Sequence, residues 1–147
     1  PRIRAVFFNI KEEHGRAHFL RAALESLCFS MRGQIDIYKK DTGHVVREVG
    51  ANGGGARSSF WMQMMADVLQ MPVHVPEAAR HSGAVGAALA AAIGLGFCGI
   101  ENVRGFVRTE HSYYPNEKLA ALYDRKYERW LRLYECIREL SGEINEE

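Results

Sequence analysis

The stretch ANGGGARSSFW (residues 51–61) places three consecutive glycines between a β-prone run and an amphipathic segment. The preceding run, Val45–Gly50, is predicted to be a strand, and the apolar residues that follow recur at helical spacing from about Ser59 to Gln70. Glycine loses more backbone freedom on folding than any other residue, so three in a row require a reason. Either the chain turns sharply here, or a ligand approaches the backbone.

A strand that leads through glycines into the start of a helix is a recurrent architecture for binding phosphate. The first turn of a helix has N–H groups without internal partners, and the helix dipole is positive at that end. The triplet matches neither GxGxxG nor GxxxxGK[ST], because no lysine opens the helix. From the residues alone, a nucleotide-binding loop and a tight turn both stay open.

The rest of the chain alternates between helical and β-prone patterns, which indicates an α/β fold. Two further strands are predicted, Ile3–Phe8 and Pro72–Glu77. Three further helices are predicted: about Arg16–Tyr38, a small-residue helix capped by Ser82, and about Asn116–Leu140. The remaining segments are expected to be irregular: the connection Val103–Lys118 and a polar tail over residues 141–147. Apolar residues predict the buried face of the first of these helices: Leu20, Leu24, Leu27, Met31, Ile35 and Tyr38.

Composition restricts the class of protein. The chain has 147 residues, 47% hydrophobic and 25% charged, which suits one globular domain. A net charge of +1 gives no reason to expect nucleic acid or a membrane as a partner. Three widely separated cysteines form no CxxC pair, which favours a reducing cytoplasm over disulfides or zinc. No signal peptide is recognisable, and no apolar run reaches the roughly 20 residues of a transmembrane helix.

The segment from VGANGGGARS to AAIGLG (residues 49–96) resembles the C-terminal domain of the FGGY carbohydrate kinases. That family usually reads GGGARS, W-x-Q, ADVLG-x-PV, a PE and a GAA-rich helix, in this order. The similar residues here are Gly53–Ser58, Trp61 with Gln63, Ala66–Leu69 with Pro72–Val73, Pro76–Glu77 and Gly86–Ala88. RAVFFNI and HGRAHFLRAALES upstream are similar to further family motifs. The terminal segment, residues 113–140, looks like the tyrosine-rich helix of the xylulokinase branch.

Four residues depart from the family pattern. Ala5, Asn9, Ser26 and Gln70 stand where the family usually has glycine. These departures leave the GGGARS loop untouched. They loosen the assignment to a subgroup, and they are compatible with a divergent substrate.

The resemblance implies a ribonuclease-H-like α/β domain of the actin-like ATPase superfamily, present here in part, with residues 1–147 forming its C-terminal segment. In that family ATP lies between two domains, and the glycine loop holds the adenosine and the α-phosphate. Gly54, Gly55 and Ala56 are then expected against the nucleotide, with Ser58 or Ser59 near the adenine or capping the helix. The residues implied in nucleotide binding are Gly53, Gly54, Gly55, Ala56, Ser58, Ser59 and Gln63.

Several neighbouring side chains have competing interpretations. Trp61 shares an apolar stripe with Met64, Met65 and Val68, which favours the core over stacking on adenine. Gln63 is off that stripe and faces either the cleft or another part of the protein. The side chain of Arg57 could contact a phosphate, or it could lie in solvent or pair with a carboxylate. Asp67 is expected to face solvent. His14 and His18 are four residues apart, but no third ligand accompanies them, so no metal site is predicted.

The chemistry of sugar phosphorylation is incomplete in this sequence. The reaction needs a carboxylate base and Mg²⁺, and the aspartates are Asp36, Asp41, Asp67 and Asp124. The DTG of Asp41–Gly43 resembles a superfamily phosphate loop, but it follows a helix and two lysines, so it is interpreted as a turn. The resemblance implies that the catalytic Asp and the sugar site precede this segment. Together with the missing initial Met, this leads us to expect the last part of a longer kinase, with no catalytic residue of its own.

The leading hypothesis is the ATP-binding C-terminal part of a cytoplasmic, xylulokinase-like sugar kinase that transfers the γ-phosphate to a sugar hydroxyl. Its expected partners are ATP or ADP and a sugar substrate, which the missing N-terminal domain would bind. Mg²⁺ is expected as a cofactor of the full-length enzyme. The alternatives are a non-catalytic actin-like module and an unrelated α/β domain. The small number of strands leaves a sheet edge uncovered, and the terminal helix offers apolar surface through Tyr123, Tyr127, Trp130 and Tyr134. Both features predict a homodimer; the alternative is a monomer whose helices cover both sides of the sheet.

Overall fold

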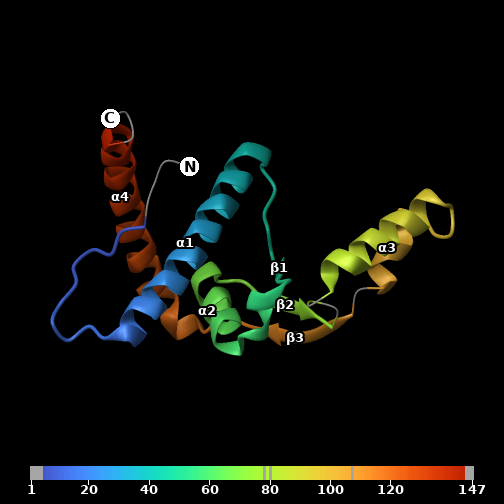
Figure 1. Ribbon diagram of the computed structural model, residues 1–147, viewed down its shortest axis with the longest axis horizontal. Helices are drawn as coiled ribbons and strands as arrows, with labels where there is room; N and C mark the ends of the chain where they lie inside the picture. The colour runs from blue at the N-terminus through green and yellow to red at the C-terminus, as the bar shows by residue number, and fades with distance from the viewer. Residues whose placement is uncertain (1–4, 78, 80, 107, 145–147) are drawn as a thin grey trace.

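The computed structural model describes residues 5–77, 79, 81–106 and 108–144 (Figure 1). Four helices and three strands alternate along this part of the chain: α1 (Arg16–Thr42), β1 (Val49–Gly50), α2 (Ser59–Leu69), β2 (Val73–Pro76), α3 (Ser82–Gly94), β3 (Thr109–Tyr113) and α4 (Ala120–Ile144). Short 3₁₀ turns occupy Gly54–Arg57, Ile100–Phe106 and Glu117–Leu119. The predicted α/β fold is confirmed.

The strands form one sheet in the order β1-β2-β3. β1 and β2 are parallel, with Val49 opposite Val73, and α2 makes the crossover between them. β2 and β3 are antiparallel, with His74 opposite Ser112. Along β2, Val73 and Val75 are buried while His74 and Pro76 are half-buried, so the two faces of the sheet are covered unequally.

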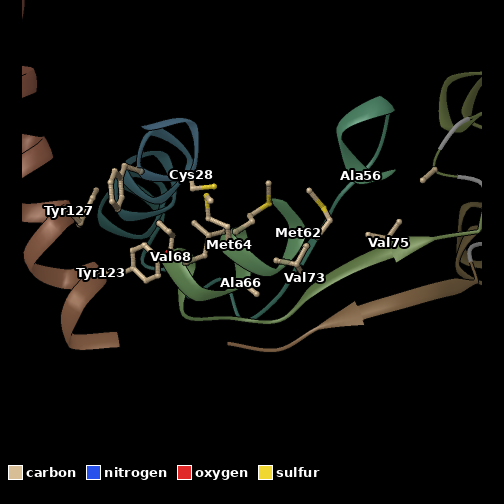
Figure 2. Packing of buried hydrophobic residues seen from close by; sticks show 14 residues of the cluster. Cys28, Ala56, Met62, Met64, Ala66, Val68, Val73, Val75, Tyr123 and Tyr127 are labelled. Carbon is tan, nitrogen blue, oxygen red and sulfur yellow. The ribbon is translucent and has the colours of Figure 1, made fainter. Parts of the chain in front are cut away.

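The core is centred on α2, whose side chains are buried nearly all round. Its buried residues pack between α1, the sheet and α4 (Figure 2). From α4, Tyr123 and Tyr127 place their rings 6.4 and 6.0 Å from the ring of Phe29 in α1. The buried residues of α2 are Met62, Met64, Met65, Ala66, Asp67, Val68 and Leu69.

A buried carboxylate joins α1 to α4. Glu25 is only 8% exposed. Its side chain accepts hydrogen bonds from the Nε of Arg21 at 3.0 Å and from the Nζ of Lys126 at 2.9 and 3.0 Å. Because a buried charge is tolerated only when it is paired and hydrogen-bonded, these two cations explain how Glu25 lies in the interface.

The apolar stripe predicted for α1 is only half right. Leu24, Met31 and Ile35 pack against the core, but Leu20, Leu27 and Tyr38 are about half exposed. Cys28 and Phe29, which the stripe omitted, are buried instead. The helix also extends to Thr42 and ends at Gly43, whose φ of 72° suits glycine.

The strand predictions need three corrections. Residues 5–8 form no strand, and residues 3 and 4 lie outside the described part. The predicted strand Val45–Gly50 shortens to Val49–Gly50. The supposedly irregular connection after Val103 contains β3.

The terminal helices also differ from their predictions. Ser82 is the first residue of α3 rather than its cap, which is His81. α4 runs on to Ile144, so residues 141–144 of the predicted polar tail are helical, and residues 145–147 lie outside the described part. Tyr123 and Tyr127 are buried, so they cannot offer the association surface expected of them.

α3 stands away from the other helices, beyond the sheet (Figure 1). Its thirteen residues all lie in the described part of the chain, and none of them is buried. None of the helices in the described ranges is long and apolar enough to cross a membrane.

Candidate functional site

The glycine loop connects β1 to α2 through the 3₁₀ turn Gly54–Arg57. The turn is closed by two backbone hydrogen bonds, from Ala56 N–H to the Gly53 carbonyl at 3.2 Å and from Ser58 N–H to the Gly55 carbonyl at 3.1 Å. The N–H of Gly53 donates to the carbonyl of Ala79 at 2.9 Å, which ties the loop to the connection between β2 and α3.

For two of the three glycines, the structure of the chain itself explains why no other residue fits. Gly53 has φ 84° and ψ −168°, a conformation that is essentially restricted to glycine. Gly55 is in contact with Trp61, because a Cβ added at residue 55 would lie 2.3 Å from the Cζ3 atom of the indole. A side chain at either position would therefore require the structure to change.

Nothing within the described chain requires glycine at residue 54. Its φ is not positive, and no atom of the described residues lies within 4 Å of a Cβ placed there. The backbone at residue 54 is open to solvent and would tolerate alanine in the free chain. The missing side chain at this position leaves room for something outside the chain.

The start of α2 is ordered by Ser58. Its backbone is extended (φ −90°, ψ 100°), and its Oγ accepts the N–H of Trp61 at 3.2 Å, which is an N-cap. Ser58 thus takes the capping role that was one of its two expected roles. Ser59 is the first residue of α2 and is exposed, as is Arg57. The side chain of Ala56 is buried in the core, so only its backbone is available to a ligand (Figure 2).

The structure places Gln63 and Asp67 together on α2. Asp67 is 7% exposed, so the prediction that it faces solvent is wrong. Its Oδ1 accepts the Nε2 of Gln63 and the N–H of Asn116, both at 2.9 Å. Gln63 also donates to the Tyr114 carbonyl at 2.8 Å. Both side chains hold the connection from β3 to α4, about fifty positions away. The bond between Gln63 and Asp67 has a local signal, their i,i+4 spacing on one helix, but the contacts with Tyr114 and Asn116 have none.

Trp61 is half-buried and packs against the core. This agrees with the interpretation that the apolar stripe of α2 includes it. Its indole N–H is buried, and the side chain that interacts with it is Cys28. A ring held in this way is not presented to a ligand as a stacking surface.

A groove of about 640 Å³ lies beside the loop, between the ends of β1 and β2 and the α3 helix. Asn52, the residue directly before the glycines, lines it, but none of the seven residues predicted to bind nucleotide does, and its lining was not predicted from the sequence. The residues around it include Asn52, His74, Glu77, Ser82, Gly86 and Arg108. Such a volume is typical of small-molecule sites.

The two histidines near the start of α1 have local roles. The Nδ1 of His14 accepts the N–H of Lys11, and the Nδ1 of His18 accepts the N–H of Gly15, both at 3.2 Å. Within the described ranges, no three His, Cys, Asp or Glu side chains come together as metal ligands. Asp41 and Thr42 are the last residues of α1 and lead into Gly43, so the DTG sequence forms a helix end.

The sequence model described as "FGGY family of carbohydrate kinases, C-terminal domain" matches residues 1–95. The chain belongs to this family. The xylulose kinase of Staphylococcus epidermidis is 32% identical over 145 residues, and the glycerol kinase of Vibrio cholerae is 32% identical over 131 residues. These alignments cover 97% and 88% of this chain but only 29% and 26% of the relatives.

A solved structure extends the similarity to three dimensions. The crystal structure of xylulose kinase from Rhodospirillum rubrum matches with a TM-score of 0.77 and 36% identity, over 93% of this chain and 28% of that one. The expected fold, part of the C-terminal domain of an FGGY kinase with its actin-like ATPase architecture, is therefore confirmed. Xylulose and glycerol kinases both match, so family membership leaves the sugar open.

Proposed function

We propose that this chain is the ATP-binding C-terminal part of a sugar kinase that transfers the γ-phosphate of ATP to a sugar hydroxyl. The observation that carries the proposal is the open space around Gly54. Neither its backbone conformation nor a contact within the described chain requires glycine there, unlike at Gly53 and Gly55. The open backbone of Gly54 lies just before the N-terminus of α2, where free N–H groups and the helix dipole favour an anion.

The nucleotide lies along the loop in this proposal. Gly53, Gly54, Gly55 and Ala56 face it with their backbone, while Ser58 and Ser59 flank it at the start of α2. The groove that Asn52 lines offers a volume for the rest of the ligand. Gln63 reaches the nucleotide only by giving up its hydrogen bonds to Asp67 and Tyr114.

The role of this chain is to bind and orient. Phosphoryl transfer depends mainly on positioning and on stabilising charge, and the nucleotide supplies the phosphoryl group. The described residues contain no cluster of metal ligands. We therefore assign Mg²⁺ to the phosphates of the nucleotide, and we assign the base to sequence outside this segment. By itself the chain is then inactive.

Xylulose is the proposed sugar. The support is the tyrosine-rich terminal helix, together with a xylulose kinase alignment of 32% identity that covers 97% of this chain. A cytoplasmic location and a homodimer complete the proposal. The lack of a CxxC pair supports the reducing compartment.

Substitution of Gly54 by alanine tests the proposal. ATP is titrated into the chain while backbone amide shifts are followed, and we expect weak binding, because a site shared between two domains loses much of its contact when one is absent. Shifts should appear first in Gly53–Ser59. Gly54→Ala should abolish them without changing stability, whereas Gly94→Ala, an equally open glycine at the end of α3, should preserve them.

The outcome also separates the alternatives. ATP-induced shifts confined to α4, or shifts that survive in Gly54→Ala, would contradict the assignment. A loop that never responds to ATP would favour a non-catalytic module with the same fold.

A further inference from the structure

The indole ring of Trp61 occupies the space in which a side chain at residue 55 would lie. A Cβ at Gly55 would be 2.3 Å from Cζ3, 3.0 Å from Cε3 and 3.3 Å from Cη2, all atoms of the six-membered ring. Gly55 is not among the residues with positive φ. The indole, rather than the backbone conformation, therefore requires glycine at residue 55.

The backbone between the two residues is fixed at both ends. Ser58 N–H bonds to the Gly55 carbonyl, and Trp61 N–H bonds to the Oγ of Ser58. Trp61 is the third residue of α2. Helical side chains tilt toward the helix N-terminus, which directs the ring of Trp61 back toward the loop.

The ring is also held from the other side. It packs against the buried core of α1 and α2. Its N–H is buried, and the side chain that interacts with it is Cys28, whose pKa the indole lowers against the larger raising effect of burial. The indole thus contributes its shape and contact area to the core.

We infer that Trp61 is a positioning residue that connects the core to the glycine loop. By supporting Gly55, it holds the turn Gly54–Arg57 in the conformation that leaves Gly54 open. The ring does not touch the ligand and acts through Gly55. The identity of the ligand rests on the proposed function. The effect of Trp61 on the conformation of the loop does not, because it exists in the chain without ligand.

The first experiment needs no ligand. Because the chain has two tryptophans, a Trp130→Phe background leaves Trp61 as the sole indole fluorophore. In that background Gly55→Ala should shift the emission of Trp61 and the amide signals of Gly54–Ser58. Gly94→Ala, where an added Cβ meets no described atom, should change neither. Unchanged emission and unchanged loop signals in Gly55→Ala would overturn the inference.

The second experiment measures coupling through the affinity for ADP. Gly55→Ala alone should weaken ADP binding by about tenfold, because residues in contact commonly show couplings large enough for such a change. Trp61→Phe removes ring volume next to residue 55, so the double variant Gly55→Ala/Trp61→Phe should regain most of the affinity. Trp61→Phe alone should also weaken ADP binding, because the smaller ring gives the turn less support.

Two results separate the failure of this inference from that of the proposed function. Additive losses in the double variant would show that Trp61 serves stability only, which overturns the inference. If the parent chain fails to bind ADP, the proposed function loses its support, and the fluorescence and amide signals of the free chain still decide whether Trp61 holds the loop.

Discussion

Gly53, Gly54 and Gly55 look equivalent in the sequence, yet each is glycine for a different physical reason. The conformation of Gly53 excludes other residues, the indole of Trp61 excludes a side chain at Gly55, and only open space surrounds Gly54. The sequence could predict that the loop is special. It could not separate these reasons, because one depends on a dihedral angle and another on a side chain six residues away.

Gly53→Ala should lower the free energy of unfolding by about 1–3 kcal/mol, since its φ of 84° and ψ of −168° are strained for any residue with a Cβ. Gly54→Ala is the matched control and should leave stability unchanged within about 0.5 kcal/mol. Urea unfolding followed by circular dichroism measures both. Equal stability of the two variants would contradict the assignment of Gly53 as the conformational glycine.

Asp67 shows the limit of prediction for a single polar residue. The sequence placed it on a helix, where most aspartates face water, and the expectation of exposure was wrong. Gln63 lies one turn away on the same helix, but the N–H of Asn116 reaches Asp67 only after the segment between β3 and α4 has packed beside α2. The spacing of Gln63 and Asp67 allows their bond to be predicted, whereas the burial of Asp67 depends on the distant contact with Asn116.

At the scale of elements, helices were predicted better than strands. The period of apolar residues located α1, α2 and α4 within a few residues of their ends. β3 was missed because TEHSY is polar and mostly exposed, and its strand conformation depends on pairing with β2. Ile3–Phe8 failed in the opposite way, since residues 5–8 are β-prone but are not paired as a strand.

The contact between α1 and α4 should weaken at alkaline pH. Burial, together with the hydrogen bond that the Tyr127 hydroxyl donates to Asp36 at 2.8 Å, raises the pKa of Tyr127 from 10.0 to about 12. A pKa that is higher in the folded state means that the neutral form is stabilised by folding. This stability is fully present below pH 10 and is lost as the pH rises to about 12.

Burial likewise raises the pKa of Cys28 from 9.0 to about 11, so the contribution of the neutral thiol to the free energy of unfolding falls from pH 9 upward.

Tyr127→Phe tests this pH dependence. The free energy of unfolding, measured in urea at steps between pH 9 and 12, should fall less steeply in the variant than in the parent chain. The difference should be on the order of 2 kcal/mol, from 1.36 kcal/mol per pKa unit. Parallel curves for the two proteins would show that Tyr127 does not titrate with a raised pKa.

For the molecule as a whole, the order of several motifs predicted the family and the fold, and both are confirmed. Composition and periodicity alone reached only the α/β class. The groove beside the loop was not predicted, because its lining comes from β1, β2, α3 and the segment before β3. Such a site depends on how the elements are arranged in space, and no local pattern encodes that arrangement.

Association is the last property of the whole molecule to be tested, and the structure changes where it is expected. Tyr123 and Tyr127 are in the core, but Phe8 is 74% exposed and Tyr134 is 42% exposed. Two apolar hollows, of about 610 and 490 Å³, are lined by the segment around Phe8 and by α4, and α1 also lines the larger one. We therefore predict a two-fold dimer through this surface, because exposed apolar patches of this kind favour burial against a partner.

Sedimentation over a range of micromolar concentrations decides between dimer and monomer. The parent chain should show a concentration-dependent mass above 16.6 kDa. Phe8→Lys and Tyr134→Lys should each shift the equilibrium toward the monomer. Phe8→Lys should cost little stability because Phe8 is 74% exposed, whereas Tyr134→Lys also removes the stacking of Tyr134 on Trp130. Phe97→Lys is the matched control, since Phe97 is 81% exposed but follows α3, and it should leave association unchanged. A single 16.6 kDa species at every concentration would show that the helices close the core without a second copy.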